Sequence, residues 1–589
     1  MISALVVYGI LALVVWTFHG LVSHYVAARK IGLPIIVTPI DALNPLWVLG
    51  RPVLAPLIQK LPFGLGEFVR YSYLGWPWEY RYRMHARYGA AFTVVTPAEC
   101  QVVVGDVDAA AEVLNRWRDF IKSPATAAPF AIFGPSVISS DGETWQRQRR
   151  ITTPPFNERN SALVWREAAR QARDMLAGWT MTTTTPGTLR DDANSLALNV
   201  LSGAGFGKPQ PFDSRYRTPE AGYEFSFLET IHTLMDNLFA TIVLASATRA
   251  PVWLLPRRFR RVRTALVECR RYLVAMVKAE REAYDAGGSQ EGGNSNNNLM
   301  STLVRVSEQA KKELHGVDNN TDHKTRGRQW LSDDEIYGNL FLYNLAGHET
   351  TANALTYGIA LLAAHPELQD WIGEEIQRVM GDEHDGEDEG KGDGRDDDDG
   401  MMGPYEQAFP RLKRCLAIMH ETLRLYSPLN GVPRWTGNSS QVLRIGGGRT
   451  VVLPPRTTVL ANNAATQTDP KLWGDDAHVW RPSRWISSEK EGEESLLPGP
   501  RDGAAFLTWS HGPRVCPGKK FSQVEFVAVV AQLFRNHRVD PVLEVGEDML
   551  DARRRIERVV EDSHVGLTVT MRHPERIRLK WSPKGEKKK

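Results

Sequence analysis

The segment Trp509–Phe521, WSHGPRVCPGKKF, holds one cysteine, Cys516, between two glycines and two prolines, directly ahead of an apolar helical run. Gly512 and Gly518 permit tight backbone turns and the close approach of a flat ligand to the chain. A thiol at a helix N-terminus is biased towards the thiolate by the helix dipole and by free N–H groups, and Arg514 adds a positive charge nearby. The pattern therefore indicates a cysteine that reacts or binds as a thiolate.

The residues of this segment leave three roles open for Cys516. A nucleophile needs a histidine base, for which His511 is the nearest residue, whereas a zinc site needs further cysteine or histidine ligands that the segment lacks. The third role is a buried structural thiol. The chain's four cysteines form no CxxC pair, which fits reduced thiols in a cytosol-facing protein better than a disulfide scaffold; they are Cys100, Cys269, Cys415 and Cys516.

The bulk properties of the chain bound its class only loosely. Its 589 residues show no internal repeat, and this length allows either one large catalytic domain or several smaller ones. The formal net charge is +2, so nothing in the total charge argues for a nucleic-acid partner.

The N-terminal segment is strongly apolar. Residues 2–26 contain no Asp, Glu, Lys or Arg, and this length can cross a hydrocarbon core of about 30 Å. A cleaved signal peptide is the alternative, but a basic region before the apolar stretch is missing and the first positive charges, Arg29 and Lys30, follow it. We therefore predict an uncleaved transmembrane anchor over residues 1–26, with the body of the protein in the cytosol by the positive-inside rule.

Composition divides the rest of the chain into three kinds of segment. Residues 27–60 contain several prolines and are predicted to form a stiff linker rather than a helix. Residues 61–589 are predicted to form the catalytic domain, with disordered insertions at 286–298 and 381–400. The second insertion has eleven acidic residues against two basic ones. Binding of calcium or of a basic partner is an alternative for it, but its irregular spacing and its glycines favour a solvated loop.

A long helix is predicted between Ser332 and Pro366. Ser332 and Glu335 form a capping box at its start and Pro366 marks its end, which gives about 33 residues and roughly 50 Å. The helix is apolar on nearly every face, so we expect it to be buried. A transmembrane helix is disfavoured because the polar group 347–351 lies at its middle, where charge is costly in lipid. We predict a buried helix with a functional break, in a fold that is mainly α with small β-sheets.

Other patterns are weak when each is taken alone. Trp145 and Arg149 stand four residues apart on one helical face, and Glu421 and Arg424 form an i, i+3 pair that is usually a surface ion pair of small effect. The segment 480–485, WRPSRW, is an aromatic, proline and arginine cluster in a loop. Each pattern on its own fits ordinary packing.

Taken together, the patterns follow a recognisable order. They read W-x-x-x-R at 145–149, A-G-x-E-T at 346–350, E-x-x-R at 421–424, P-x-R-W at 482–485 and G-x-R-x-C-x-G at 512–518. This order resembles the cytochrome P-450 superfamily of haem-thiolate monooxygenases, in its membrane-anchored microsomal type, from about Tyr80 to the C-terminal region. The chain departs from the family where Trp509 and Trp485 replace common phenylalanines and Ser483 replaces an acidic residue. A tryptophan at 509 should still shield the sulfur.

The resemblance implies a role for each motif residue. It makes Cys516 the axial ligand of haem iron, whose thiolate favours O–O cleavage. Thr350 would contact bound dioxygen, and Glu349 would feed protons to it through water. The residues expected to hold the haem propionates are Trp145, Arg149, Arg434 and Arg514. A buried structural network behind the haem is expected from Glu421, Arg424 and Arg484.

The resemblance also implies cofactors, partners and location. The cofactor would be haem b, with electrons from NADPH delivered through a separate NADPH-cytochrome reductase or a cytochrome b-type donor. The implied reaction is hydroxylation or epoxidation of a small apolar molecule, in fungal-type secondary metabolism, at the endoplasmic reticulum membrane with one span. Oxidative phenol coupling, desaturation or ring rearrangement on the same haem are alternatives. A non-redox isomerase or sensor is disfavoured by the intact pair Glu349 and Thr350.

Two sets of residues lie outside the motifs. Arg147, Arg150, Lys519 and Lys520 would form either a basic surface that docks an acidic reductase or ordinary solvated charge. The apolar segments Ser123–Ser140 and Leu238–Arg258 are predicted to line or cap a substrate pocket. The second segment is also predicted to contact a membrane surface.

Overall fold

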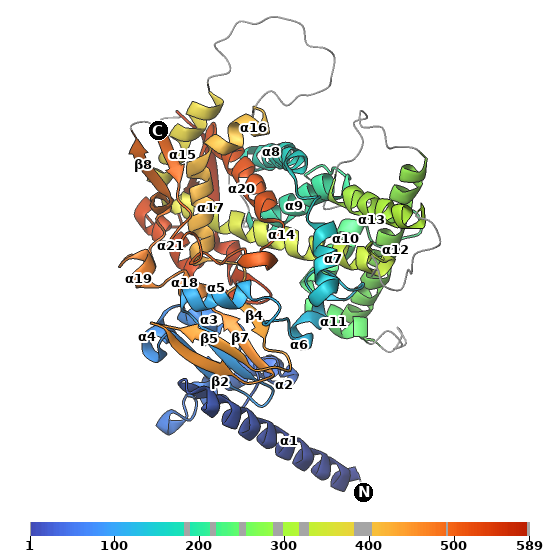
Figure 1. Ribbon diagram of the computed structural model, residues 1–589. Coiled ribbons are helices and arrows are strands. Elements are labelled where there is room, and N and C mark those ends of the chain that lie inside the picture. The colour runs from blue at the N-terminus through green and yellow to red at the C-terminus, as the bar shows by residue number, and fades with distance from the viewer. Residues whose placement is uncertain are drawn as a thin grey trace, which may run out of the picture.

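The computed structural model describes residues 2–181, 189–212, 219–246, 255–286, 298–316, 329–381, 403–490 and 493–585. A large body of helices lies beside a smaller region of strands, and helix α1 lies at the outer edge of that region (Figure 1). Except for Ala286, Asn298 and Gly381, the two predicted insertions lie outside the described residues. The mainly helical fold with small sheets is confirmed.

The helices are α1 (Ile2–Ile31), α2 (Pro45–Ile58), α3 (Trp76–Tyr80), α4 (Arg83–Tyr88), α5 (Val107–Asn115), α6 (Pro124–Ala127), α7 (Gly142–Thr152), α8 (Glu158–Met181), α9 (Leu189–Val200), α10 (Phe227–Asp236), α11 (Leu238–Ser246), α12 (Arg257–Asp285), α13 (Leu299–Gly316), α14 (Asp333–Ala364), α15 (Pro366–Met380), α16 (Tyr405–Ala408), α17 (Lys413–Leu425), α18 (Asn463–Thr466), α19 (Pro470–Trp473), α20 (Lys519–Phe534) and α21 (Met549–Glu561). A π-helical turn, Leu201–Gly205, follows α9.

The strands are β1 (Ile35–Val37), β2 (Ala91–Val95), β3 (Cys100–Val104), β4 (Val432–Trp435), β5 (Gln441–Ile445), β6 (Arg449–Leu453), β7 (Thr457–Ala461), β8 (Ile486–Lys490), β9 (Glu493–Leu496), β10 (His537–Pro541), β11 (Ser563–Val565), β12 (Val569–Met571) and β13 (Leu579–Pro583). The main sheet has the order β1-β2-β3-β7-β4. β3 pairs parallel with β7, and β4 pairs antiparallel with β7, which places Arg434 opposite Val459.

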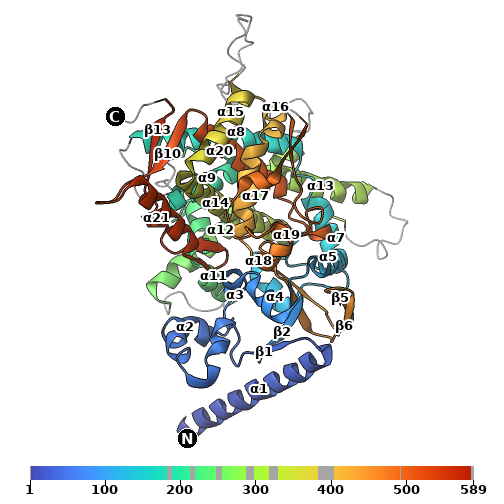
Figure 2. The ribbon, with the colours of Figure 1, turned by 90° about the vertical axis from the view of Figure 1, so that its left-hand side faces the viewer.

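Helix α14 is the predicted long helix and crosses the middle of the helical body (Figures 1 and 2). It has 32 residues, and both hydrogen bonds of the capping box between Ser332 and Glu335 are present. The buried position is confirmed, because most of its residues are inaccessible on every face. The predicted break is wrong as an interruption of the helix, since α14 runs continuously from Asp333 to Ala364.

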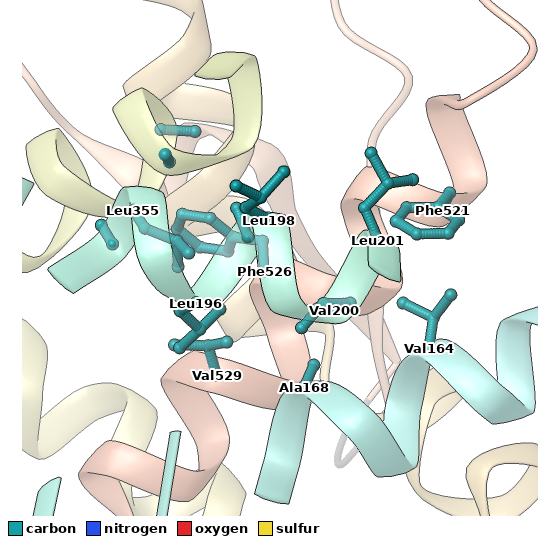
Figure 3. Packing of buried hydrophobic residues seen from close by; sticks show 14 of the residues in the cluster. Val164, Ala168, Leu196, Leu198, Val200, Leu201, Leu355, Phe521, Phe526 and Val529 are labelled. Atoms are coloured by element: carbon teal, nitrogen blue, oxygen red, sulfur yellow. The ribbon is translucent and has the colours of Figure 1, made fainter. Parts of the chain in front are cut away.

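Helix α20 lies against α8, α9 and α14 in the centre of the core. Figure 3 shows Val529 and Phe526 of α20 packed among Leu196, Ala168 and Leu355 of the neighbouring helices. Because α20 is apolar around most of its circumference, it is buried on all sides rather than along one stripe. The helix therefore fixes the cysteine that precedes it relative to α14.

The last turns of α1 pack against the main sheet. Ala28 and Ile31 are buried there, and Nδ1 of His24 lies 3.0 Å from the carbonyl oxygen of Thr96. Within the described residues, no helix is long and apolar enough to cross a membrane. The helix predicted at the N-terminus is therefore present and continues to Ile31, but the transmembrane span predicted for residues 1–26 is not confirmed.

The predicted linker, residues 27–60, contains regular structure. It includes the end of α1, the strand β1, which pairs with β2, and the helix α2. Asn44 caps α2 by accepting hydrogen bonds from the backbone N–H groups of Leu46 and Trp47. Pro45 stands at the first position of this helix, where no N–H bond is lost, whereas Pro52 and Pro56 stand inside it on its exposed side. How the chain divides into domains stays a prediction.

Candidate active site

The loop around Cys516 is built by a short 3₁₀ turn, Gly512–Arg514, and by the start of α20. The backbone N–H of Cys516 donates to the carbonyl of Trp509 at 2.8 Å. Gly512 has a φ of +70°, and a Cβ there would lie 2.5 Å from Oδ1 of Asn115, so only glycine fits. The loop thus folds back on itself and presents the thiol from a fixed position.

Cys516 differs from the other three cysteines in its surroundings. Cys100, Cys269 and Cys415 are buried, whereas the side chain of Cys516 is accessible. Burial nevertheless raises the pKa of the Cys516 thiol, while the backbone N–H of Gly518 and the charges of Arg149 and Lys519 lower it. A thiol that is deep in the protein and still accessible lines an internal space, where a ligand can reach it.

Two of the alternatives for Cys516 find no support in the described part of the chain. No group of three His, Cys, Asp or Glu residues stands close enough there to hold a metal ion, which disfavours zinc. Accessibility excludes a merely buried structural thiol. The roles that remain are a nucleophile and the ligand of a bulky cofactor in the internal space.

The centre of α14 opens onto an internal space. Between Glu335 and Ala364, the residues that are not buried are Ala346, Gly347, Glu349 and Thr350. The hydroxyl of Thr350 donates to the carbonyl of Ala346 at 2.9 Å. A Cβ on Gly347 would lie 3.2 Å from Cδ2 of Leu201, so a larger residue there would press on the π-helical turn. The predicted catalytic pair therefore lies on the accessible face.

Phe156 connects α14 to the cysteine loop. Its ring meets that of Tyr343 of α14 edge-on, with centroids 5.5 Å apart. The same ring is in van der Waals reach of Gly518, since a Cβ there would lie 3.9 Å from Cε1 of Phe156. Arg149 of α7 also reaches the loop, because its Nη2 donates to the carbonyl of Val515 at 2.8 Å. The accessible thiol and the accessible helix face therefore belong to one region.

Beside this region lies a cluster of buried cations. Arg434 is 4% exposed, and Arg514 forms an ion pair with Asp141. The backbone N–H of Lys122 donates to the same carboxylate at 3.0 Å, while its ammonium group donates to the carbonyl of Ile138 and lies within electrostatic range of Arg514 and Arg434. Within the described residues, Nε of Arg434 and Nε of Arg514 are buried without a hydrogen-bond partner. Two of the predicted propionate residues are thus together, and Lys122 is a member that sequence reasoning missed.

This cluster carries more positive than negative charge. Burial, followed by the charge of Arg514, lowers the pKa of Arg434 to about 10. Burial and the charges of Arg514 and Arg434 hold the pKa of Lys122 well below its usual range, and Asp141 opposes this only in part. Since buried charges are normally paired, a cluster of three cations with one carboxylate fits a ligand that carries further carboxylates. The two propionates of haem meet that requirement.

Trp145 and Trp117 lie beside the cation cluster. Their ring centroids are 4.5 Å apart, and Cζ of Arg514 lies 4.4 Å from the centroid of Trp145. This cation–π contact holds the guanidinium flat against the indole. Trp145 therefore orients Arg514, while the predicted partner Arg149 is bonded to the cysteine loop.

The predicted network behind the site is present and fully buried. Glu421 and Arg424 are both 0% exposed and form a bidentate pair with both N···O distances at 2.8 Å. Nε of Arg484 reaches Oε1 of Glu421 at 2.9 Å. The backbone N–H of Arg481 donates to Oε1 of Glu421 at 2.8 Å, and Trp485 adds a fourth partner by donating from Nε1 to Oε2 at 2.9 Å, a bond that phenylalanine cannot make. The two carboxylate oxygens of Glu421 therefore accept all of these hydrogen bonds.

One residue of the predicted basic surface, Arg147, does not lie on the surface. Arg147 points inward and forms an ion pair with Glu335, with Nη2 and Oε1 at 2.5 Å. It belongs to the cap of α14, and its prediction as a surface residue is wrong, because the carboxylate of Glu335 needs a partner as it becomes buried. Arg150 and Lys519 are exposed, and Nζ of Lys520 lies 3.8 Å from Glu158.

One of the two predicted pocket segments lies against α14. Phe133 of the segment Ser123–Ser140 meets Phe341 of α14 edge-on at 4.7 Å. The backbone N–H of Val137 donates to Oδ1 of Asn339 at 2.9 Å. The second segment, Leu238–Arg258, forms α11 up to Ser246, and its residues 247–254 lie outside the described residues.

The body is mainly helical and carries an accessible cysteine before a core helix, an opposing accessible helix face and an uncompensated cation cluster. Together these features define a haem-thiolate protein. The model of the cytochrome P450 family matches residues 60–559, and the chain belongs to that family. It is accordingly an oxidoreductase of the monooxygenase type, with haem as its cofactor.

Several fungal proteins are similar over almost their whole length. A cytochrome P450 monooxygenase of Arthrobotrys oligospora is 28% identical and covers 97% of this chain and 96% of its own. A cytochrome P450 monooxygenase of Penicillium roqueforti is 29% identical, over 91% and 90% of the two chains. A phomenoic acid biosynthesis cluster cytochrome P450 monooxygenase of Leptosphaeria maculans is 28% identical, over 95% of each chain.

Proposed function

We propose that Cys516 is the axial ligand of haem b and that the chain oxygenates a small apolar molecule. The observation that carries this proposal is the accessible thiol of an otherwise enclosed cysteine, beside the cation cluster of Lys122, Arg434 and Arg514. A thiolate ligand and donors for two carboxylates are what iron protoporphyrin IX requires from a protein.

Bound haem supplies the site with reductive activation of dioxygen, and its thiolate ligand favours O–O cleavage. The residues of α14 supply protons to that chemistry. Glu349 holds a carboxyl group on the accessible face, one residue before the hydroxyl of Thr350. Protons pass from Glu349 through water to Thr350, whose Oγ1 is fixed by its bond to the carbonyl of Ala346. Arg149 holds the cysteine loop through the carbonyl of Val515.

Electrons come from NADPH through a separate membrane-bound cytochrome reductase, or from a cytochrome b-type donor. The exposed charges of Arg150 and Lys519 flank the helix and the loop that carry Trp145 and Cys516, so an acidic partner docked there approaches the thiolate side. Complementary charge of this kind mainly increases the rate of association.

The substrate is a small apolar molecule, and the pathway is fungal secondary metabolism. The likeness to the Leptosphaeria maculans protein, whose name places it in a phomenoic acid biosynthesis cluster, supports the pathway. Apolar residues of the segment Ser123–Ser140, such as Phe133, lie against α14 and support the apolar character of the pocket. Product formed under labelled dioxygen carries the label if the reaction is oxygenation, and lacks it if the reaction is phenol coupling or desaturation.

The chain attaches to the cytosolic face of the endoplasmic reticulum membrane through its N-terminal region. α1 and α2 lie at the same end of the molecule (Figures 1 and 2) and expose large apolar side chains, among them Tyr8 at 70% and Leu46 at 78%, and the turn that follows α2 exposes Phe63 at 97%. An exposed apolar surface of this size marks a membrane or protein contact. Flotation of the full chain with phospholipid vesicles tests the attachment, and the variant L46S/L49S/V53S should float less than the wild type.

The experiment that tests the thiolate assignment is the spectrum of the reduced protein with carbon monoxide. Wild type should give the red-shifted Soret band of a thiolate-ligated haem, and C516A should lose it. C100A, which removes a buried thiol in the sheet, should keep the band. A red-shifted band in C516A would refute the ligand assignment, and turnover that needs neither NADPH nor reductase would favour a non-redox isomerase.

A further inference from the structure

A hairpin near the C-terminus is held against the accessible part of α14. Its strands β11 and β12 pair antiparallel, with Val565 opposite Val569, and Gly566, Leu567 and Thr568 form the turn. The hairpin directly follows α21, which packs along α14 (Figure 2). The backbone N–H of Val569 also donates to the carbonyl of Pro428 at 3.0 Å. Backbone contacts therefore hold both ends of the turn, independently of its side chains.

Three polar residues of α14 bind this hairpin from one stripe of the helix. Glu349, Asn353 and Tyr357 follow one another at intervals of four, which places them on the same face. Oε1 of Glu349 accepts a hydrogen bond from Oγ1 of Thr568 at 2.8 Å. Nδ2 of Asn353 donates to the same Oγ1 at 3.0 Å, and the hydroxyl of Tyr357 lies 2.7 Å from Oγ of Ser563.

The direction of these bonds is fixed by the atoms available. The hydroxyl of Thr568 has one hydrogen, and Asn353 occupies its oxygen as a donor, so the hydrogen points at Glu349. Thr568 and Asn353 are both 3% exposed, which keeps water from competing for these positions. One oxygen of Glu349 is thus held, while among the described residues the other accepts no hydrogen bond and stays free for water.

We propose that Thr568, oriented by Asn353, is a positioning residue that fixes the carboxyl group of Glu349 for proton delivery. The inference rests on the proposed role of Glu349 as proton donor. Without Thr568, the long side chain of Glu349 regains rotamers that the hairpin now excludes, and the distance to the next proton acceptor varies. The C-terminal hairpin is then part of the oxygen-activating machinery and not only a wall of the pocket.

The test compares five variants of the full-length holoenzyme. T568V removes the hydroxyl and keeps the shape, whereas T568S keeps the hydroxyl. T570V is the matched control, because Thr570 is a buried threonine of the same hairpin with no hydrogen bond to α14 in the described structure. E349Q, alone and combined with T568V, removes the acid. The carbon monoxide spectrum and the thermal unfolding midpoint confirm haem binding and folding in each variant.

The first readout is independent of activity. The infrared band of the Glu349 carboxyl group is identified as the difference between wild type and E349Q. In T568V this band should move to higher wavenumber, because the hydrogen bond to Oε1 is lost, while T568S and T570V should leave it in place. An unchanged band in T568V would overturn the proposal.

The second readout is NADPH consumption with reductase and 7-ethoxycoumarin as an apolar probe, in H₂O and in D₂O. T568V should slow consumption about 5- to 20-fold and increase the solvent isotope effect, since a misplaced acid contributes less than the roughly 10²–10⁴-fold of a placed one. T568S should restore the wild-type rate. The double variant should be no slower than E349Q, and a multiplicative loss would overturn the proposal.

The two proposals fail in different ways. If E349Q consumes NADPH like the wild type, the proposed role of Glu349 is wrong, whatever T568V does. If E349Q is slow and T568V is not, Glu349 is the proton donor and the hairpin does not position it.

Discussion

The indole of Trp485 donates a hydrogen bond from Nε1 to Oε2 of Glu421 at 2.9 Å. Glu421 is 0% exposed and accepts its other hydrogen bonds from Arg424, Arg484 and the backbone N–H of Arg481, so the indole completes the shell of a buried carboxylate. Phenylalanine, the residue that the family resemblance leads us to expect here, could not make this bond, so Trp485 adds a donor to the network.

Replacement of this indole should be costly in a specific way. W485F should lower the free energy of unfolding by about 1.5–3 kcal/mol, the range for a hydrogen bond to a charged group. W480F is the matched control, since Nε1 of Trp480 donates to the neutral Oγ1 of Thr422 at 3.2 Å, and it should lose only about 0.5–1.5 kcal/mol. Urea unfolding of both variants measures the difference, and equal losses would mean that the charge of Glu421 does not matter.

Lys122 should have opposite effects on the haem-free and the haem-bound protein. K122M removes one of three clustered cations, so the haem-free protein should become more stable, because it relieves the burial of the ammonium group and its repulsion by Arg514 and Arg434, which together lower the pKa of Lys122. Haem should leave K122M about 10- to 100-fold faster, equivalent to about 1.5–3 kcal/mol for a lost charge-assisted bond. Haem transfer to apomyoglobin measures the rate, with exposed Arg150 as R150M for the control. Equal haem retention in K122M and wild type would remove Lys122 from the propionate site.

Variants of Arg147 and Arg150 should affect different properties, the first the free energy of unfolding and the second the docking of the reductase. R147M leaves the carboxylate of Glu335 buried without its ion-pair partner, so the free energy of unfolding should fall by about 3–5 kcal/mol. R150M should change it by less than about 0.5 kcal/mol and should instead raise the KM for reductase, with a larger effect at low salt. The measurements are urea unfolding and reductase titration. A reductase effect without a stability effect in R147M would contradict the inward position of that side chain.

Buried His420 should make the protein sensitive to acid. Burial, followed by the charge of Lys519, lowers its pKa to about 3, and burial lowers that of His85 to about 4. A histidine whose folded pKa is depressed contributes stability that is fully present above the unfolded pKa, about 6.5, and that is lost as the pH falls towards the folded pKa. Between pH 6.5 and 4, His420 alone should account for a loss on the order of 2–3 kcal/mol.

The variant H420F tests this account. It keeps an aromatic ring among Trp485, Phe506 and Trp509 but cannot take up a proton. Its free energy of unfolding should fall less steeply below pH 6.5 than that of the wild type, with His85 still contributing. A pH dependence as steep as that of the wild type would show that proton uptake by His420 does not cause the loss of stability in acid.

Local sequence signals predicted the elements that depend on neighbours in the chain. The capping box of α14, its proline stop and the helix after Cys516 were predicted because each is decided within a few residues. The transmembrane span was predicted from composition, which does not report that the last turns of α1 pack against the main sheet. The linker was predicted from prolines, which α2 accommodates at its start and on its exposed side.

The sequence by itself determined the residue types of the proposed site: a cysteine before a helix, an acid and a hydroxyl on a buried helix, and an acid–arginine pair. These features are carried by residue type and short spacing. Only the tertiary structure decided which other residues join them. Lys122 lies in the cation cluster, Arg147 pairs with Glu335 instead of lying on the surface, and Thr568 binds Glu349, which is 219 positions away in the sequence. Such partners are chosen by the packing of distant elements, because a buried polar group must find its hydrogen bonds wherever the fold places a donor.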